Sequence, residues 1–593
     1  MSEKIVRIGG ASAFWGDSGV AAPQLVRRGQ VDYLMFDYLA EVTLSIMVNA
    51  RRRDPTKGYA GDFVTVAMAQ VLREVKQKGI RVVANAGGMN PSACVAALKA
   101  LAAEQGVDVR IAHVEGDDLL PQREMLRDVR EMFSGAAAPE SIVSMNAYLG
   151  AVPIAAALRA GADIVVTGRC ADSAMALGPL IHEFGWALDD WDRLAAGTLV
   201  GHILECGAQA TGGLHTDWEK VERWEDIGYP IAECLADGSF VVTKPPGTGG
   251  LVTPATVGEQ LLYEIGDPAA YIVPDVVCDF RDVRITQQGP DRVHVTGARG
   301  RPATRTYKVS ATYMDGWRAF GNLTIVGIDA AKKAERTAEA ILARTRAMFR
   351  DHNFGDYAET SIEILGAEQQ YGPHSRVRAA REVVMKLGVK HADRAALELF
   401  AREISPAGTS WSPGTTGNFG GGRPDPAPVV RLFSFLIDKG VTAPVVHMDG
   451  EITPVDVPRG VADLPAPHAL DVASPVPVEP GALTVSRRLI ELVWARSGDK
   501  GDSANIGVIA RDPALLPILR RELTAERVKA YFAHLVEGEV VRYDLPGFHA
   551  MNFLMTKALG GGGAASLRND PLAKGFAQML LDLEIEAPSS LAI

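Results

Sequence analysis

The feature that most constrains the fold is a repeated order in which a short apolar strand ends in a polar loop and a helix follows. Apolar runs at 4–9, 31–36, 80–84, 109–114 and 162–167 each precede such a loop. Nearly continuous apolar strands that alternate with helices are typical of parallel sheets covered on both faces. We therefore predict an α/β fold with a doubly wound, mostly parallel sheet in the main body.

The rest of the chain predicts two further units. Alternating segments at 292–296 and 306–313 indicate antiparallel strands, so we expect an additional α+β subdomain from about residue 279, with helices at 330–349 and 375–389. A proline-rich tract at 451–484 predicts an extended linker. It would separate a main body of residues 1–450 from a small two-layer α+β C-terminal domain at 485–593.

Composition excludes several classes of protein. A chain of 593 residues exceeds one hydrophobic core, and its 47% hydrophobic and 22% charged residues are typical of globular proteins. The net charge of −11, with both signs interspersed, argues against a nucleic-acid partner. The chain has no apolar run long enough for a membrane span, and its five cysteines form no C-x-x-C pair. We expect a cytoplasmic protein, no membrane partner and a homo-oligomer.

Polar residues at the strand ends are the candidate ligand-binding groups, because ligands of open α/β sheets bind beyond the carboxyl ends of the strands. These candidates are Gly10, Ser12, Asn85, Gly87, Gly88, Asn90, Arg169 and Ser173, to which a preorganised loop with two prolines adds Lys244 and Thr248. Loop N–H groups, short amides and fixed cations together suit a phosphate or a carboxylate. The alternative is structural: the glycines permit tight turns, Arg169 braces a loop through Asp172, and Lys244 belongs to a rigid surface turn.

Four acids are the candidate catalytic residues, because the proposed chemistry needs a general acid or base. They are Asp37, Glu41, Asp172 and Glu205. Cys170 and Cys206 are weaker candidates for a nucleophile, since neither has an evident histidine partner.

Two kinds of cofactor site are not predicted. The histidines at 182, 202 and 215, with Glu183 and Glu205, show neither H-x-H nor H-E-x-x-H spacing, so we predict no metal site. The glycines at 9, 10, 16 and 19 lack the G-x-G-x-x-G spacing of a NAD site, and no Walker lysine follows them.

In the tail, the loop at 496–503 is consistent with a salt-bridged hairpin or with a loop that closes over the cleft of the main body.

Long segments of the chain resemble a known family. The strings at 161–186, 201–213 and 241–276, together with GGASAFWGDS and FDYLAE near the start, resemble the AtuA-like family of acyclic terpene utilisation proteins. The string ARSGDKGDSANIGVIAR at 495–511 resembles the small domain often joined to that body. The resemblance implies a role in bacterial breakdown of branched isoprenoids such as citronellol and geraniol, whose intermediates are coenzyme A thioesters.

The resemblance and the strand-end residues together suggest an enzyme. We expect it to act on a branched acyl-CoA or a related hydroxyacid, as a lyase or hydratase. The coenzyme A thioester would be the substrate, and the sequence identifies no cofactor. Two alternatives stay open: a non-catalytic scaffold or regulatory component of a catabolic enzyme complex, and a thioester or ester hydrolase.

Overall fold

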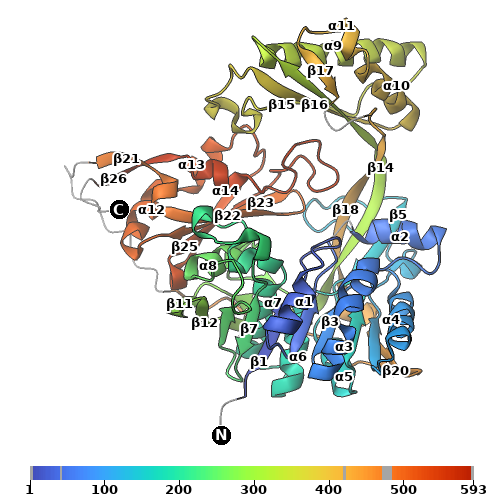
Figure 1. Ribbon diagram of the computed structural model, residues 1–593, viewed down its shortest axis with the longest axis vertical. Coiled ribbons are helices and arrows are strands. Elements are labelled where there is room, and N and C mark those ends of the chain that lie inside the picture. The colour runs from blue at the N-terminus through green and yellow to red at the C-terminus, as the bar shows by residue number, and fades with distance from the viewer. Residues whose placement is uncertain (1–3, 41–42, 419–421, 471–483, 589–593) are drawn as a thin grey trace.

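The main body is built on an eleven-stranded mixed sheet of order β11-β12-β8-β7-β1-β2-β3-β6-β4-β19-β20 (Figure 1). The computed structural model describes residues 4–40, 43–418, 422–470 and 484–588. The strands are β1 (Val6–Gly10), β2 (Tyr33–Phe36), β3 (Arg81–Ala84), β4 (Ile111–Glu115), β6 (Ile164–Thr167), β7 (Ile231–Cys234), β8 (Phe240–Thr243), β11 (Arg284–Gly289), β12 (Arg292–Thr296), β19 (Val445–Met448) and β20 (Glu451–Pro454).

The centre of this sheet is parallel. Strands β1, β2, β3, β6 and β4 are neighbours in that order, and all four pairings between them are parallel. The strands on either side are antiparallel. The predicted α/β class is confirmed, and its parallel part is the five central strands. Because parallel strands end at the same edge, the loops after β1, β2, β3 and β6 meet there.

Helices cover both faces of the central strands. Side chains from α1, α2, α3 and α4 form the core on one face, and those from α5, α6, α7 and α8 form the core on the other. Val82 faces the first core and Val83 the second, which is why the strand needs apolar residues at successive positions. The helices are α1 (Ala21–Arg28), α2 (Thr43–Arg53), α3 (Ala69–Lys78), α4 (Pro91–Gln105), α5 (Val152–Arg159), α6 (Ala174–Phe184), α7 (Trp191–Leu204) and α8 (Pro254–Leu262).

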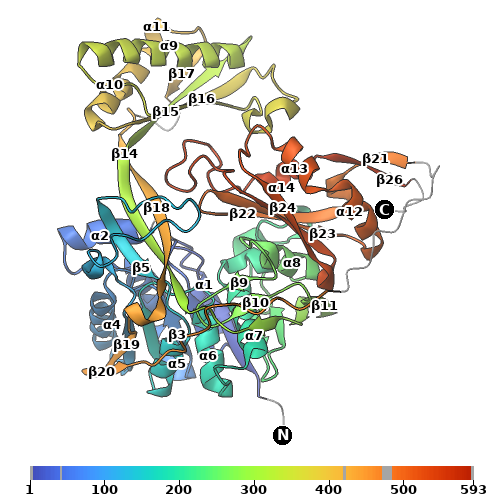
Figure 2. The same ribbon diagram turned by 180° about the vertical axis from the view of Figure 1, so that it is seen from behind.

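One long strand leads from the main body into a separate lobe. Strand β14 (Thr306–Val326) pairs with β5 (Ile142–Ala147) and β18 (Ala427–Asp438) in its first half and with β16 and β17 in its second half. Figures 1 and 2 show the lobe set apart from the main body at the far end of this strand. Its elements are α9 (Ala330–Asp351), β15 (Glu359–Leu365), β16 (Glu382–His391), α10 (Arg394–Ile404), α11 (Ala407–Ser410) and β17 (Thr415–Asn418).

The structure differs in two details from the α+β subdomain predicted from about residue 279. Strands β11 and β12 belong to the main sheet, so the lobe begins within β14 and not near residue 279. The predicted helix at 375–389 is wrong, because the segment ends in strand β16. Val383, Met385, Leu387 and Val389 are all buried and alternate with less buried residues, which is the period of a strand.

The proline-rich tract is bound to the main body over the part that the structure describes. Residues 451–454 form β20 of the main sheet. Beyond it, the Val461 N–H donates to the Ala303 carbonyl, and Arg301 donates to the Pro465 carbonyl. This segment is therefore an extended strap with defined contacts on the body.

The C-terminal domain has a four-stranded antiparallel sheet of order β22-β23-β25-β24 with helices packed against it. The helical segment at 516–531 is broken into two helices, because Thr524 caps the second one by accepting from the Arg527 N–H. The elements are β21 (Thr484–Arg488), β22 (Val493–Lys500), β23 (Ser503–Ala510), α12 (Leu516–Glu522), α13 (Ala525–Tyr531), β24 (Val540–Leu545), β25 (Ala550–Met555), α14 (Phe576–Leu580) and β26 (Glu584–Pro588).

Two buried asparagines join this domain to the main body. Asn552 donates to the carbonyls of Ile265 and Gly266 at 3.0 and 2.7 Å and accepts from Asn505 at 2.8 Å. Asn505 in turn donates to the Leu262 carbonyl at 2.7 Å. The segment after α8 is thus hydrogen-bonded to two strands of the C-terminal domain. Among the helices of the described ranges, none is both long and apolar enough to cross a membrane.

Replacing Asn552 tests this junction. The Asn552→Ala change leaves two buried carbonyls without their donor, which costs about 1–3 kcal/mol for each unsatisfied group. We expect the urea or thermal unfolding midpoint of the C-terminal domain to fall. Lys529→Ala, on the exposed side of α13, is the matched control and should leave the midpoint unchanged. Equal midpoints for the two variants would contradict the role assigned to Asn552.

Candidate functional site

Polar side chains from three neighbouring strand ends meet around Asp37. Asp37 follows β2, and its carboxylate oxygen Oδ1 accepts from Asn85 Nδ2 at 2.7 Å. Asn85 follows β3 and also accepts from the Tyr38 N–H at 2.7 Å. Ser12, after β1, donates to the Asp37 carbonyl at 2.8 Å. All three predicted residues are buried, and their mutual hydrogen bonds fix Asp37 in one position.

Arg169 supplies a fixed cation at the end of β6. Its Nη2 lies 2.8 Å from Asp172 Oδ1, and its guanidinium carbon lies 4.1 Å from the ring centroid of Tyr148. Its Nη1 donates to the Leu39 carbonyl, two residues beyond Asp37. The Arg169 residue is only 3% exposed, whereas the side chain of Asp172 is 30% exposed. Arg169 therefore contacts both the loop that carries the buried Asp37 and the partly exposed Asp172.

The environment of Asp37 favours its protonated form. Burial is the main cause that raises its pKa well above the usual value, and the nearby negative charges of Asp172 and Glu205 raise it further. The positive charge of Arg169 acts in the opposite direction but does not cancel these effects. Asp172 differs from Asp37 in that it is ion-paired to Arg169 and partly exposed.

Glu205 is a second buried acid in the same cluster. Burial raises its pKa, and the neighbouring His202 partly offsets this. His202 lies near the end of α7, with Nε2 2.9 Å from the Leu261 carbonyl and Nδ1 3.3 Å from Glu205 Oε1. Because a carbonyl only accepts, Nε2 of His202 carries a proton.

Several buried polar atoms in this cluster lack hydrogen-bond partners among the described residues. They include Arg169 Nε, Glu205 Oε2 and Gln260 Oε1. Gln260 belongs to the cluster because its Nε2 donates to the His202 carbonyl at 2.9 Å. Buried polar atoms are normally paired, so their concentration here indicates a place prepared for a polar ligand.

The tail loop at 496–503 is a hairpin that packs on the main body. Strands β22 and β23 pair up to Lys500 and Ser503. Arg496 donates to the carbonyls of Leu214 and Gly213 and to Gln209 Oε1. The charge of Lys500 lowers the pKa of Glu205, opposing the larger effect of burial. The C-terminal domain thus adds a positive charge to the electrostatics of the cluster.

Lys244 and Thr248, predicted to share this site, form a separate bracing pair. Lys244 Nζ lies 3.0 Å from Asp291 Oδ2 and donates to the Thr248 carbonyl at 3.0 Å. Thr248 Oγ1 donates to the Pro245 carbonyl at 2.6 Å. The expectation that Lys244 binds a ligand beside Asp37 is corrected, since its charge is engaged by Asp291 between β11 and β12 and by the carbonyl of Thr248 in its own loop.

Other predicted ligand residues serve packing. Asn90 Nδ2 donates to the carbonyls of Pro55 and Lys57, so its amide holds a loop. A Cβ at Gly10 would lie 2.5 Å from the Leu204 carbonyl oxygen, and one at Gly87 would lie 2.6 Å from the Thr167 oxygen. Both strand ends approach a neighbouring backbone too closely for any side chain.

The remaining predicted residues are Gly88, Ser173 and Glu41. Gly88 has a φ of +52°, and a Cβ there would meet the Met47 sulfur, so it permits a turn. Ser173 is buried at the start of α6, where the backbone of Gly201 approaches it. Glu41 lies outside the described residues.

The two candidate cysteines and the histidines at 182, 202 and 215 do not gather into one reactive group. Burial raises the pKa of the Cys170 thiol to about 12 and that of Cys206 well above its usual value, which disfavours a thiolate nucleophile. His215 pairs with Glu259 at 2.8 Å, and His182 lies 2.7 Å from Arg81 Nη1. These two histidines thus have different partners from His202.

Sequence reasoning missed residues that support the cluster. Asp117, after β4, accepts from the Arg169 N–H and from Asn146 Nδ2, both at 2.8 Å. Burial raises the pKa of Asp117 to about 7. Asp117 follows a strand end, so the rule that selected Asp37 would have selected it too. Tyr148 gave no such signal, because its contact with Arg169 depends on tertiary packing.

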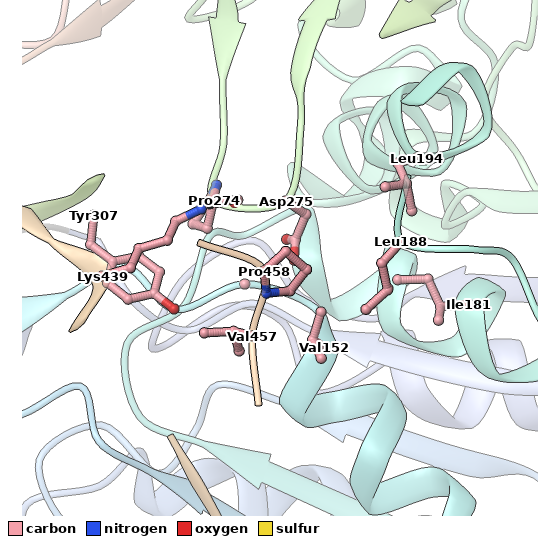
Figure 3. Close-up of a pocket in the computed structure, with 11 residues that line it drawn as sticks. Val152, Ile181, Leu188, Leu194, Pro274, Asp275, Tyr307, Lys439, Val457 and Pro458 are labelled. Carbon is pink, nitrogen blue, oxygen red and sulfur yellow. Dashed lines mark hydrogen bonds between the residues drawn. The ribbon is translucent and has the colours of Figure 1, made fainter. Parts of the chain in front are cut away.

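The pocket in Figure 3 has a different lining, which includes Val152, Tyr307 and Pro458. The Asp275 carboxylate there accepts from the Ala151 N–H at the start of α5, and Lys439 Nζ donates to the Pro274 carbonyl at 2.7 Å. Its free volume is about 10 Å³, close to that of a single water. The strap residue Pro458 therefore covers a small packing defect, and this pocket is too small for an organic ligand.

Comparisons with known proteins identify two regions. Residues 6–448 match the family model described as acyclic terpene utilisation family protein AtuA. Residues 487–586 match the AtuA ferredoxin-like domain. No curated protein and no solved structure matches the chain.

The protonation of Asp37 has a measurable effect on stability. Because its pKa is raised in the folded protein, the folded state loses stability as the pH rises from about 4, the usual value for aspartate, through the folded pKa. Asp37→Asn removes this penalty and keeps an acceptor for Asn85. We expect the free energy of unfolding of the variant to rise relative to wild type as pH rises, by about 1.4 kcal/mol for each unit of pKa shift. Thermal unfolding at a series of pH values measures this difference. The exposed Asp189→Asn is the control, and a difference that does not change with pH would contradict the assignment.

Proposed function

Since this chain belongs to the AtuA family of acyclic terpene utilisation proteins, we propose that it is an acid–base enzyme of isoprenoid breakdown. It acts as a lyase or hydratase on a branched acyl-CoA thioester or a related hydroxyacid. The observation that carries this proposal is the pair Asp37 and Asp172 near one fixed guanidinium: burial raises the pKa of Asp37, whereas Asp172 is ion-paired to Arg169 and partly exposed. Two carboxyl groups in different environments are a common basis for acid–base catalysis.

The two carboxyl groups suit the removal of water from a hydroxyacyl substrate. In this step the Asp172 carboxylate accepts the proton from the carbon next to the carbonyl. The electron pair of that C–H bond forms the C=C bond, and the hydroxyl group leaves from the neighbouring carbon as water with a proton from Asp37. The reverse sequence adds water. Both directions conserve atoms and need no redox partner.

Arg169 is the group placed to bind the carbonyl or carboxylate of the substrate. Its Nε has no protein partner among the described residues, while its other nitrogens hold Asp172 and the Leu39 carbonyl. A fixed cation stabilises the negative charge that develops on a carbonyl oxygen when the neighbouring carbon loses a proton. The exposed part of Asp172 gives the substrate a route to this position.

The thioester hydrolase alternative has less support. It needs a nucleophile, and the burial that raises the pKa values of Cys170 and Cys206 makes both thiols poorly reactive. The scaffold alternative has no specific contact in its favour, because the hairpin of the C-terminal domain is already bound to the main body.

A panel of branched enoyl-CoA and hydroxyacyl-CoA thioesters, with the free hydroxyacids, tests the proposal. Mass spectrometry would follow gain or loss of water, and free thiol would report hydrolysis. We expect Asp172→Asn and Asp37→Asn each to lower kcat by about 100-fold to 10,000-fold, the usual contribution of a general acid or base. Asp189→Asn should retain full activity.

Three outcomes would count against the proposal. Binding without turnover under all conditions would favour the scaffold. Release of free coenzyme A that Cys170→Ala abolishes would favour the hydrolase. Unchanged water addition in both aspartate variants would remove these residues from the reaction.

A further inference from the structure

A second group of chemically active side chains lies on β4 and β19, outside the acid cluster. His113 and Glu115 are two residues apart on β4, so they share one face of the strand. His447 on β19 lies directly opposite His113 in the antiparallel register. Figure 2 shows β19 and β20 at the outer edge of the main body. The three side chains are brought together by the pairing of segments far apart in the chain.

Their ligand atoms converge. His113 Nε2 lies 3.3 Å from Glu115 Oε1, and His447 Nε2 lies 3.3 Å from Glu115 Oε2. One ligand atom from each of the three residues lies within 4.8 Å of the others. The imidazole rings are stacked with centroids 4.5 Å apart and an interplanar angle of 11°, so both face the same carboxylate.

The nitrogens that face the carboxylate lack well-formed hydrogen bonds. Both Nε2 atoms are buried and have no hydrogen-bond partner of acceptable geometry among the described residues, although His113 is 9% exposed overall. A cation between the three groups would use both nitrogens and the carboxylate as electron-pair donors.

The spacing fits a particular coordination geometry. Zinc binds histidine nitrogen and carboxylate oxygen at about 2.0–2.1 Å in a tetrahedral arrangement. Two ligands at that distance and the tetrahedral angle are separated by roughly 3.3–3.4 Å. Each histidine lies 3.3 Å from a different oxygen of Glu115, and one ligand atom from each of the three residues lies within 4.8 Å of the others, so a small closure of the side chains reaches this geometry. Two histidines with one carboxylate are also an established donor set for zinc that leaves one position open.

We propose that His113, Glu115 and His447 form a binding site for a divalent transition-metal ion, with zinc the best match. The side chain of Glu115 is 41% exposed, so an ion can reach the site from solvent. Arg51 lies within electrostatic reach of Glu115 and opposes binding, but its Nη1 donates to the Met89 carbonyl at 2.6 Å. This site is independent of the acid–base function proposed above.

A bound ion would also join β19 to the end of β4. Asp117, which holds the Arg169 backbone, follows Glu115 by two residues. The ion would therefore restrain the strand end that supports Arg169, without itself contacting the acid cluster.

The test uses full-length protein freed of metal by a chelator and titrated with Zn²⁺ alone in a calorimeter. We expect one ion to bind per chain and the melting temperature to rise with Zn²⁺ concentration. Glu115→Gln and His447→Gln should each weaken Zn²⁺ binding by more than about 100-fold, beyond what loss of an outer-shell partner costs. His294→Gln, on β12 at the other end of the same sheet, is the matched control and should bind as wild type does.

Co²⁺ gives a second readout that does not depend on stability. Its visible spectrum should report a four-coordinate site with nitrogen and oxygen ligands, and the spectrum should be lost in Glu115→Gln. Absence of stoichiometric binding by wild type would overturn the proposal. So would equal affinity in Glu115→Gln, His447→Gln and His294→Gln. Circular dichroism of each variant separates loss of the site from loss of the fold.

Discussion

The guanidinium of Arg169, buried at the end of β6, is the interaction on which the candidate site depends. A buried cation is tolerated only when opposite charge and hydrogen-bond acceptors surround it. Arg169 meets this requirement with Asp172, the Leu39 carbonyl and the face of Tyr148. Each contact also positions its partner, since Leu39 follows Asp37 in the same loop. Removal of one partner of a buried ion pair typically costs about 3–5 kcal/mol, so the site and the local fold are coupled.

The parallel strands explain why these groups meet at all. They bring the loops after β1, β2, β3 and β6 to one edge, and the C-terminal domain adds its hairpin nearby. The asparagine pair at 505 and 552 fixes that hairpin against the segment after α8. Lys500 can then influence Glu205 although the two residues belong to different domains. The lobe carried by β14 is set apart from this region (Figure 1).

The sequence predicted the part of the site that follows from strand order. Asp37, Asn85 and Arg169 each follow an apolar strand, and parallel pairing brings such positions together whatever the details of packing. Lys244 was expected to join them from a rigid loop, yet β8 is antiparallel to β7 and Lys244 is held by Asp291. In the structural alternative the glycines permit tight turns, whereas at Gly10 and Gly87 a neighbouring backbone approaches too closely for a side chain, which no local pattern encodes.

Other features depend on contacts that no local pattern encodes. Strand β14 continues past Asp315 and Gly316, residues that normally indicate a turn, because they form an irregularity in the pairing with β18, which resumes at Trp317 where pairing with β16 begins. The convergence of His113, Glu115 and His447 depends on the register between β4 and β19. Neither histidine has a metal-binding spacing in the sequence, so a search for motifs passes over them.

The most direct test of the central claim is the protonation state of Asp37 at neutral pH. Infrared difference spectra of wild type and Asp37→Asn should show a protonated carboxyl stretch in wild type that the variant lacks. Asp172→Asn should retain this band, because the band belongs to Asp37. An Asp37 that is fully ionised at neutral pH would contradict the account, since the proposed proton donor would then be missing.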